Sequence, residues 1–410
     1  MRSIMPIEEN TWESPKSIWN RMFLSIFFAN MALNMGQQMS NSLLSLYANS
    51  LGSPADQIGQ LMSMFAVTAL IFRFVSGPAM NAFDRKKLVA MAMGFMATAY
   101  MGFSLAPTIA GVTGLEAITI LKFFRLIQGI GNAFGNSCCL TIVSDTLPKD
   151  KFTTGMGYYA CAQVTAQAIG PTVGVFLRDC FGYNVTYIIN FVVMCCAILV
   201  SAQVKLAPRE KKEFRLNLSN IIAKEALVPA GITFLIHMGF TSISSFLLVY
   251  SEERGISGGS WFFTIYAVTL LVTRPMVGKL TDKYGFVKIG IPAVCMTACS
   301  LAMIGFSVNT AMLLLAAFIN AFGYGAVQPM LQSLCMKSVP PERRGSASST
   351  NYIGMDIAML LGPSLCGMVA DMVGYTPVMW LAMMVPVIAG MLGIVIFRKN
   401  IQGIEKKFRG

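Results

Sequence analysis

The chain has 410 residues, of which 55% are apolar and only 12% are charged. Because a soluble domain carries about 25% charged residues, this composition excludes an ordinary soluble enzyme and indicates a membrane protein. The net charge of +12 comes from basic residues in the predicted loops, so it does not imply nucleic-acid binding. One histidine and ten cysteines without a Cys-x-x-Cys motif predict no metal site, no cofactor and no disulfide. The sequence also has no Walker-type phosphate loop, which argues against an ATP-driven pump.

Twelve apolar runs follow one another along the chain, each long enough to cross a hydrocarbon core of about 30 Å. They are expected at 18–49, 56–82, 86–106, 112–145, 153–178, 183–204, 224–251, 258–281, 286–307, 310–337, 344–370 and 375–397. Only one connection is long and polar, and it lies between the sixth and seventh runs. The sequence therefore predicts an all-α membrane protein with two six-helix bundles. The predicted parts are an N-terminal segment (1–17), bundles at 18–204 and 224–397, a linker at 205–223 and a tail at 398–410.

The two predicted bundles share a sequence repeat. Residues 66–73 read AVTALIFR and return as AVTLLVTR at 267–274, an offset of 201. In the same way, Gly170-Pro171 returns as Gly362-Pro363, an offset of 192. Two parallel halves in an apolar chain are typical of a secondary transporter whose substrate site lies between them. Such a chain is expected to work as a monomer.

The distribution of basic residues predicts the orientation in the membrane. Lysine and arginine fill the loops on the side of the linker, whereas the opposite loops hold only Arg178 and Arg254. By the positive-inside rule, both termini and the linker should face the cytoplasm, in a multi-pass protein of the cell membrane. The polar first 17 residues do not fit a cleavable signal peptide.

A loop motif follows the eighth run. Residues 278–288 read GKLTDKYGFVK, with Gly278, Asp282, Lys283 and Gly285 at its marked positions. This resembles the G-x-L-x-D-[RK]-x-G-x-x-[RK] loop of the major facilitator superfamily, and the resemblance covers the whole chain. It implies two bundles that open alternately to the two sides of the membrane.

The corresponding loop of the first half departs from the family pattern. It contains Gly77 and Arg85, but Asn81 stands where the family has an aspartate. The departure leaves Asp84 and Asp145 as candidates to supply the missing charge.

A second motif lies in the fifth run, where Gly157, Gly170, Pro171 and Gly174 are similar to the family's antiporter motif, G-x8-G-x3-G-P-x2-G-G. The resemblance implies export, especially drug:proton antiport. Physically, Gly170-Pro171 predicts a kink, and the small residues predict close packing against a neighbouring helix. The alternative is ordinary tight packing of a proline-containing helix.

The fourth run carries the family-like motif R-x-x-Q-G-x-G, with Arg125 and Gln128, followed by Asn132. Lys122 lies one turn before Arg125. Cations inside a membrane are unfavourable unless they line a wet cavity or meet an acid, so both are predicted in the transport path. Arg73 and Arg274, at equivalent places in the repeat, are instead expected to snorkel or to pair with inner-loop acids.

Polar stripes at helical spacing predict further lining of the path. The residues are Asn30, Asn34, Gln37 and Asn41 in the first run, Gln163 and Gln167 in the fifth, and His237 and Thr241 in the seventh. The alternative is hydrogen bonding between helices.

Asp356, in the middle of the eleventh run, is the deeply placed carboxylate that predicts a proton carrier. Its alternative role is a structural ion pair.

Together these patterns predict a transporter that exports small, amphiphilic organic molecules in exchange for protons. The expected partners are the substrate, protons and the lipid bilayer. Uptake or exchange of an organic anion is the alternative, because Lys122 and Arg125 would make the cavity cationic.

Overall fold

A computed structural model describes residues 17–53, 55–202, 214, 221–256, 259, 261–374 and 376–409. Most of the predicted N-terminal segment and linker lie outside these residues. Throughout the described part the chain is helical, and no strand occurs there. The predicted all-α class is therefore confirmed.

The first bundle contains α1 (Arg21–Ser50), α2 (Ala55–Ala82), α3 (Arg85–Thr113), α4 (Ala117–Thr146) and α5 (Phe152–Ala202). α5 is long enough for two crossings, and it is interrupted at Gly182, where φ is 78° and ψ is 171°. A residue without a Cβ adopts this backbone conformation without strain. The predicted fifth and sixth helices are thus the two parts of α5. The helix continues through Gly170 and Pro171, where the sequence predicted a kink.

The second bundle contains six long helices and ends in a short one. These are α7 (Leu227–Glu253), α8 (Trp261–Tyr284), α9 (Phe286–Gly305), α10 (Thr310–Lys337), α11 (Arg344–Val373), α12 (Pro377–Ile396) and α13 (Arg398–Arg409). Short 3-10 helices, η1 (Lys149–Lys151), η2 (Lys224–Ala226) and η3 (Pro341–Arg343), precede α5, α7 and α11. With α5 counted as two, the described residues form twelve long helices.

Ten helices of the described chain are long and apolar enough to cross a membrane, with the whole of α5 counted once. α1 is not among them, although it has 30 residues. The polar residues predicted to line the path lower the hydropathy of α1. Because such residues are unfavourable in lipid, the face of α1 that carries them is expected to pack against protein.

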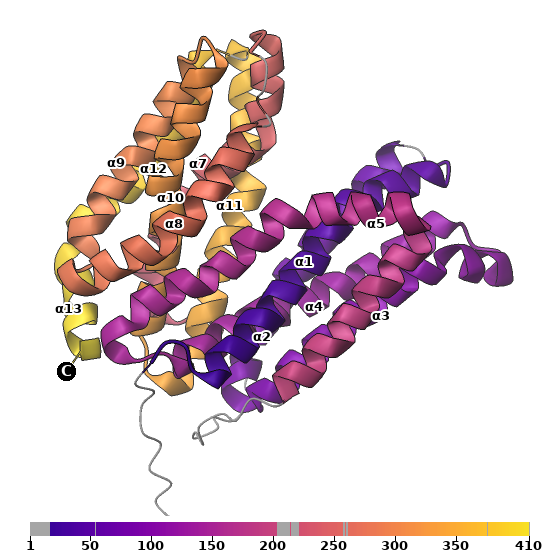
Figure 1. The fold of residues 1–410 in the computed structure, drawn as a ribbon. Helices are drawn as coiled ribbons and strands as arrows, with labels where there is room; N and C mark the ends of the chain where they lie inside the picture. Colours follow the sequence, from indigo (N-terminus) through magenta and orange to yellow (C-terminus); the bar gives the residue numbers. More distant parts are fainter. Residues whose placement is uncertain are drawn as a thin grey trace, which may run out of the picture.

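Figure 1 shows the two bundles side by side, with α13 and the C-terminus at the end where they approach each other. Away from that end the ribbons diverge. We call the end where α2 and α8 finish and α5 and α11 begin the linker end. Here α2 packs against α11, and α5 packs against α8, so that each contact joins one bundle to the other.

Glycines allow α5 to lie close to α1 within the first bundle. A Cβ added to Gly170 would lie 2.8 Å from the Gln38 Cβ, and one on Gly174 would lie 3.4 Å from the Met39 Cα. Gly362 takes the corresponding place between α11 and α7, where Met238 O lies 3.0 Å from its added Cβ. The close packing predicted from these small residues is confirmed.

Gly170→Ala is expected to destabilise the protein, because the new methyl group overlaps Gln38. Overpacking of this kind costs about 1–3 kcal/mol, so the thermal unfolding midpoint in detergent should fall. Gly94→Ala is the matched control, since nothing lies within 4 Å of a Cβ there. Equal midpoints for the two variants would contradict this account of the α1–α5 contact.

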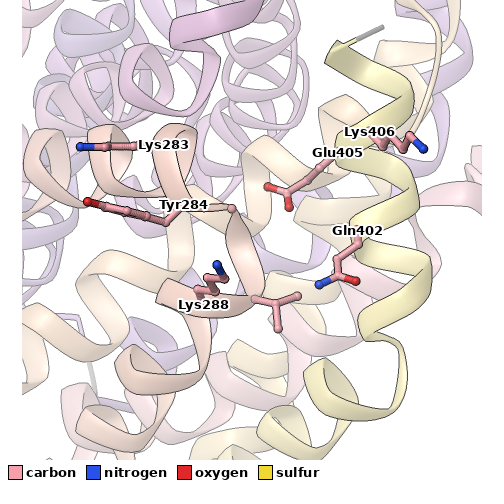
Figure 2. A pocket seen from close by; sticks show the side chains of 8 residues that line it. Lys283, Tyr284, Lys288, Gln402, Glu405 and Lys406 are labelled. Carbon is pink, nitrogen blue, oxygen red and sulfur yellow. The ribbon is translucent and has the colours of Figure 1, made fainter.

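The C-terminal helix α13 was not predicted, because its many charged residues are typical of a solvated tail. Ile401 is fully buried, and Phe408 packs on Phe152 at the start of α5, with ring centroids 4.9 Å apart. The Glu405 carboxylate accepts a hydrogen bond from Phe286 N at 2.9 Å, at the start of α9. A surface pocket between α13 and the α8–α9 turn is lined by Lys283, Lys288 and Gln402, among others (Figure 2).

Candidate transport path and inter-bundle contacts

Asp282, at the end of α8, connects the second bundle to the first. Its carboxylate accepts hydrogen bonds from Thr153 N at 3.0 Å, Thr154 N at 2.7 Å and the Thr154 hydroxyl at 2.8 Å. The first N–H groups of a helix have no partner within that helix, and they attract negative charge. Asp282 therefore caps α5 of the opposite bundle. Lys337 Nζ lies 3.6 Å from the same carboxylate.

Asn81, the repeat equivalent of Asp282, lies in the first bundle and caps a helix of the second bundle. Its Oδ1 accepts from Gly345 N at 3.1 Å, and its Nδ2 donates to the Ser346 hydroxyl at 2.6 Å. Both residues lie at the start of α11. The amide thus keeps the inter-bundle cap although the carboxylate is absent from this half.

The loop glycines make these contacts possible by letting backbones approach. A Cβ on Gly278 would lie 2.7 Å from the Thr154 Cα, and one on Gly77 would lie 3.0 Å from the Ser349 Cβ. Gly157 acts similarly, because its Cβ would lie 2.6 Å from the Arg274 carbonyl oxygen. All three glycines lie where α2 meets α11 or α5 meets α8.

Asp145 is the acid that links charges across the linker end. Its carboxylate pairs with Arg85 of the first bundle and, at 2.7 Å, with Arg344 of the second. Arg85 also donates to the Pro341 carbonyl at 3.0 Å. Of the two acids proposed to compensate for Asn81, Asp145 therefore takes this place. Asp84 instead caps its own helix, α3.

The deep carboxylate, Asp356, pairs with Arg73 across the bundle boundary. Arg73 Nε donates to Asp356 Oδ2, and Nη1 donates to Ala133 O at 3.3 Å and to the Ser137 hydroxyl at 3.2 Å. The Arg73 side chain is 3% exposed and that of Asp356 is 20% exposed. Arg73 lies nine residues before the end of α2, about 14 Å along the axis.

The prediction that Arg73 and Arg274 snorkel or meet inner-loop acids was therefore wrong. Arg73 meets a carboxylate from the middle of α11, and Arg274 is buried. Arg274 donates to the Ala160 carbonyl of α5 and, at 3.0 Å, to Gln328 Oε1 of α10. Sequence position alone could not reveal these partners, because they lie more than 50 residues away along the chain.

Arg125 is buried within the first bundle. It donates to Gln128 and, at 2.8 Å, to Asn41 Oδ1, and its guanidinium lies 4.6 Å from the centre of the Phe65 ring. Lys122 does not share this environment, because it is partly exposed and donates to Gln60 at 2.9 Å. Of the two cations predicted in the transport path, only Arg125 is therefore buried.

The polar stripe of α1 faces the interior of its bundle. Asn34 donates to Asn30 at 3.0 Å and to Asn136 of α4 at 3.4 Å, and Asn136 donates to Asn132 at 2.7 Å. The sequence analysis gave hydrogen bonding between helices as the alternative role of this stripe, and these bonds are of that kind. The Gln37 Oε1 atom is buried without a hydrogen-bond partner in the described structure. The sequence missed Asn136, although it continues the Asn132 stripe by one turn.

The polar residues of α5 and α7 have different environments. Gln167 is exposed and Gln163 is partly buried. The Thr241 hydroxyl donates to the Ala358 carbonyl of α11 at 3.2 Å, so it serves helix packing. His237 is buried, and its Nδ1 is hydrogen-bonded to the Tyr324 hydroxyl.

Two pseudo-symmetric bundles with ion pairs and helix caps between them are typical of a membrane transporter. The family model described as Major Facilitator Superfamily matches residues 26–232 and 229–407. The chain belongs to this superfamily.

Two bacterial export proteins are similar to the chain along nearly its full length. The Staphylopine export protein of Staphylococcus aureus is 22% identical, over 91% of this chain and 94% of its own. The multi-drug resistance efflux pump PmrA of Streptococcus pneumoniae is 21% identical, over 93% and 97%. A bacterial homologue of the iron transporter ferroportin, solved in an outward-facing state, has a TM-score of 0.79 and 14% identity, covering 93% of this chain and 100% of its own. This last likeness shows the fold alone.

Proposed function

We propose that the protein exports small organic molecules from the cytoplasm in exchange for protons. The observation that carries the proposal is the Arg73–Asp356 pair, a partly buried ion pair that joins the two bundles. Protonation of Asp356 would remove one charge of the pair and so weaken the contact between α2 and α11. Proton binding would thereby be coupled to opening of the linker end.

The remaining contacts agree with this cycle. With the linker end closed by Asp282, Asn81 and Asp145, Asp356 would receive its proton from the opposite, external side. Opening would then release the proton to the cytoplasm and admit the substrate. The similarity to two export proteins supports the outward direction of substrate transport.

The proposal can be tested in proteoliposomes that hold the purified protein. An imposed pH gradient should drive fluorescent amphiphilic dyes against their concentration gradient, and a protonophore should abolish this transport. Transport that is unaffected by the protonophore would contradict proton coupling. Transport of the dyes in the same direction as the protons would contradict exchange.

The proposed direction requires the linker end to face the cytoplasm. In a cysteine-free variant, Arg254→Cys on intact cells should react with a membrane-impermeant maleimide, whereas Lys399→Cys should react only after lysis. Arg254 follows α7 at the far end, and Lys399 is exposed on α13. The reverse labelling pattern would overturn the orientation.

A further inference from the structure

Arg274 is the repeat equivalent of Arg73, but no acid among the described residues pairs with its charge. The offset that relates Gly170 to Gly362 relates Val164 of α5 to Asp356 of α11. Val164 is 2% exposed and packs in a hydrophobic cluster whose other members come from the second bundle. In the repeat it corresponds to Asp356, the residue that meets Arg73 in the other half.

The described residues place no carboxylate within ion-pair distance of Arg274, and they leave its buried Nε without a hydrogen-bond partner. A buried cation without an opposite charge is strongly disfavoured in a membrane protein. Arg125 is also without an acid, but its partners belong to its own bundle and stay with it throughout the cycle. Arg274 differs, because its bond to Ala160 crosses the bundle boundary.

An aromatic wall adjoins Arg274. Phe240 stacks on Tyr324 with ring centroids 4.3 Å apart and on Tyr266 at 5.4 Å. Tyr266 lies two turns before Arg274 on α8. Tyr324 lies one turn before Gln328 on α10, the residue that accepts a hydrogen bond from Arg274. Tyr324 also holds His237, whose buried Nε2 has no partner within the described structure. The cluster thus combines one uncompensated cation, one free imidazole nitrogen and flat apolar rings.

We infer that Arg274 binds the anionic group of the exported substrate, which is an aromatic organic anion. This inference deepens the proposed function and rests on it for the direction of transport. When the linker end opens, α5 leaves α8 and Arg274 loses the Ala160 carbonyl. A carboxylate entering from the cytoplasm replaces that carbonyl, while the aromatic body lies on the wall. On closure Ala160 returns and displaces the anion toward the outside.

Three naphthalene compounds that differ in charge test the inference by direct binding to the purified full-length protein. They are 1-naphthoate, 1-naphthamide and 1-naphthylmethylammonium, titrated while thermal stabilisation is recorded. We expect stabilisation by naphthoate, with the amide and the cation at least about tenfold weaker, which is about 1.4 kcal/mol. Absence of naphthoate binding, or equal binding of the amide, would overturn the inference.

Variants at Val164 test the role of Arg274 without removing it. Val164→Asp should supply the missing acid, pair with Arg274 and reduce naphthoate binding at least about tenfold. Val164→Asn is the matched control and should bind naphthoate like the wild type. Arg274→Gln should lose binding as well, and Arg274→Lys should retain part of it. Wild-type naphthoate binding in Val164→Asp would overturn the inference.

The binding assay separates this inference from the proposed export function. Naphthoate binding that depends on Arg274, together with transport that ignores the pH gradient, would leave the anion site standing and reject proton exchange. Conversely, proton-driven export of dyes with no charge preference in binding would leave the function standing and reject the anion site.

Discussion

Asp356→Asn is expected to lose proton-driven transport by at least about tenfold, while substrate exchange without a gradient continues. The amide cannot take up a proton, so the variant resembles the protonated protein at every pH. Its oxygen still accepts a hydrogen bond from Arg73, and Arg73 keeps its bonds to Ala133 and Ser137. The variant should therefore fold and reach the membrane.

Proteoliposomes measure the two activities separately, as uphill flux under a pH gradient and as exchange of labelled for unlabelled dye. Asp179→Asn is the matched control, because Asp179 forms an exposed pair with Arg178 and its side chain is 59% exposed. Such surface pairs contribute about 0–1 kcal/mol. Undiminished uphill flux in Asp356→Asn would assign Asp356 a purely structural role.

A double variant tests whether the Arg73–Asp356 pair also acts as a latch, that is, whether it holds the linker end closed. Arg73→Gln combined with Asp356→Asn removes both charges, so no unpaired cation remains in the interior. If the pair serves as a latch, this variant should open the linker end more often than the wild type. A change confined to protein stability, with unchanged accessibility at that end, would contradict the latch.

The sequence predicted the helices well because long apolar runs are strong local signals. The break at Gly182 falls where the sequence placed the loop between the fifth and sixth helices. The amphipathic α13 escaped notice, since Ile401, Ile404 and Phe408 are separated by polar or charged residues and glycine, and they gain a partner surface only in the folded protein. Its packing on Phe152 depends on the position of the other bundle.

The sequence identified candidate functional residues more readily than it identified the residues that they contact. Asp356 attracted attention as a carboxylate within an apolar run, but its partner Arg73 lies 283 residues away and was assigned to the helix end. Which charges meet depends on how the two bundles pack, and that information is absent from local spacing. The repeat contained one usable signal, because it aligns Val164 with Asp356 and so leaves Arg274 without an acid.

The repeat also explains why an amide can replace the loop aspartate in one half. Asp282 and Asn81 each accept from the first N–H groups of a helix in the opposite bundle. Helix starts are satisfied nearly as well by asparagine as by aspartate, so the cap survives the loss of charge. What changes is the electrostatic contribution, which Asp145 supplies through Arg85 and Arg344.

Asp282→Ala should therefore shift the protein toward the state with an open linker end. Loss of a helix cap costs about 0.5–2 kcal/mol, which corresponds to a shift of about 2- to 30-fold in the equilibrium. Here the cap joins the two bundles, so the loss acts on the conformational equilibrium as well as on folding. Distances between spin labels at Lys279 and Lys151, on opposite bundles, should lengthen in a larger fraction of molecules.

Asp282→Asn is the conservative comparison. It should lie between Asp282→Ala and the wild type, because it keeps the cap, as Asn81 does in the other half, but loses the charge that faces Lys337. The opposite change, Asn81→Asp, should strengthen the contact with the start of α11 by adding a charge where the helix favours one. It should shift the equilibrium toward the closed linker end and slow transport. Equal spin-label distances in Asp282→Ala, Asp282→Asn and the wild type would show that the caps do not control the opening of this end.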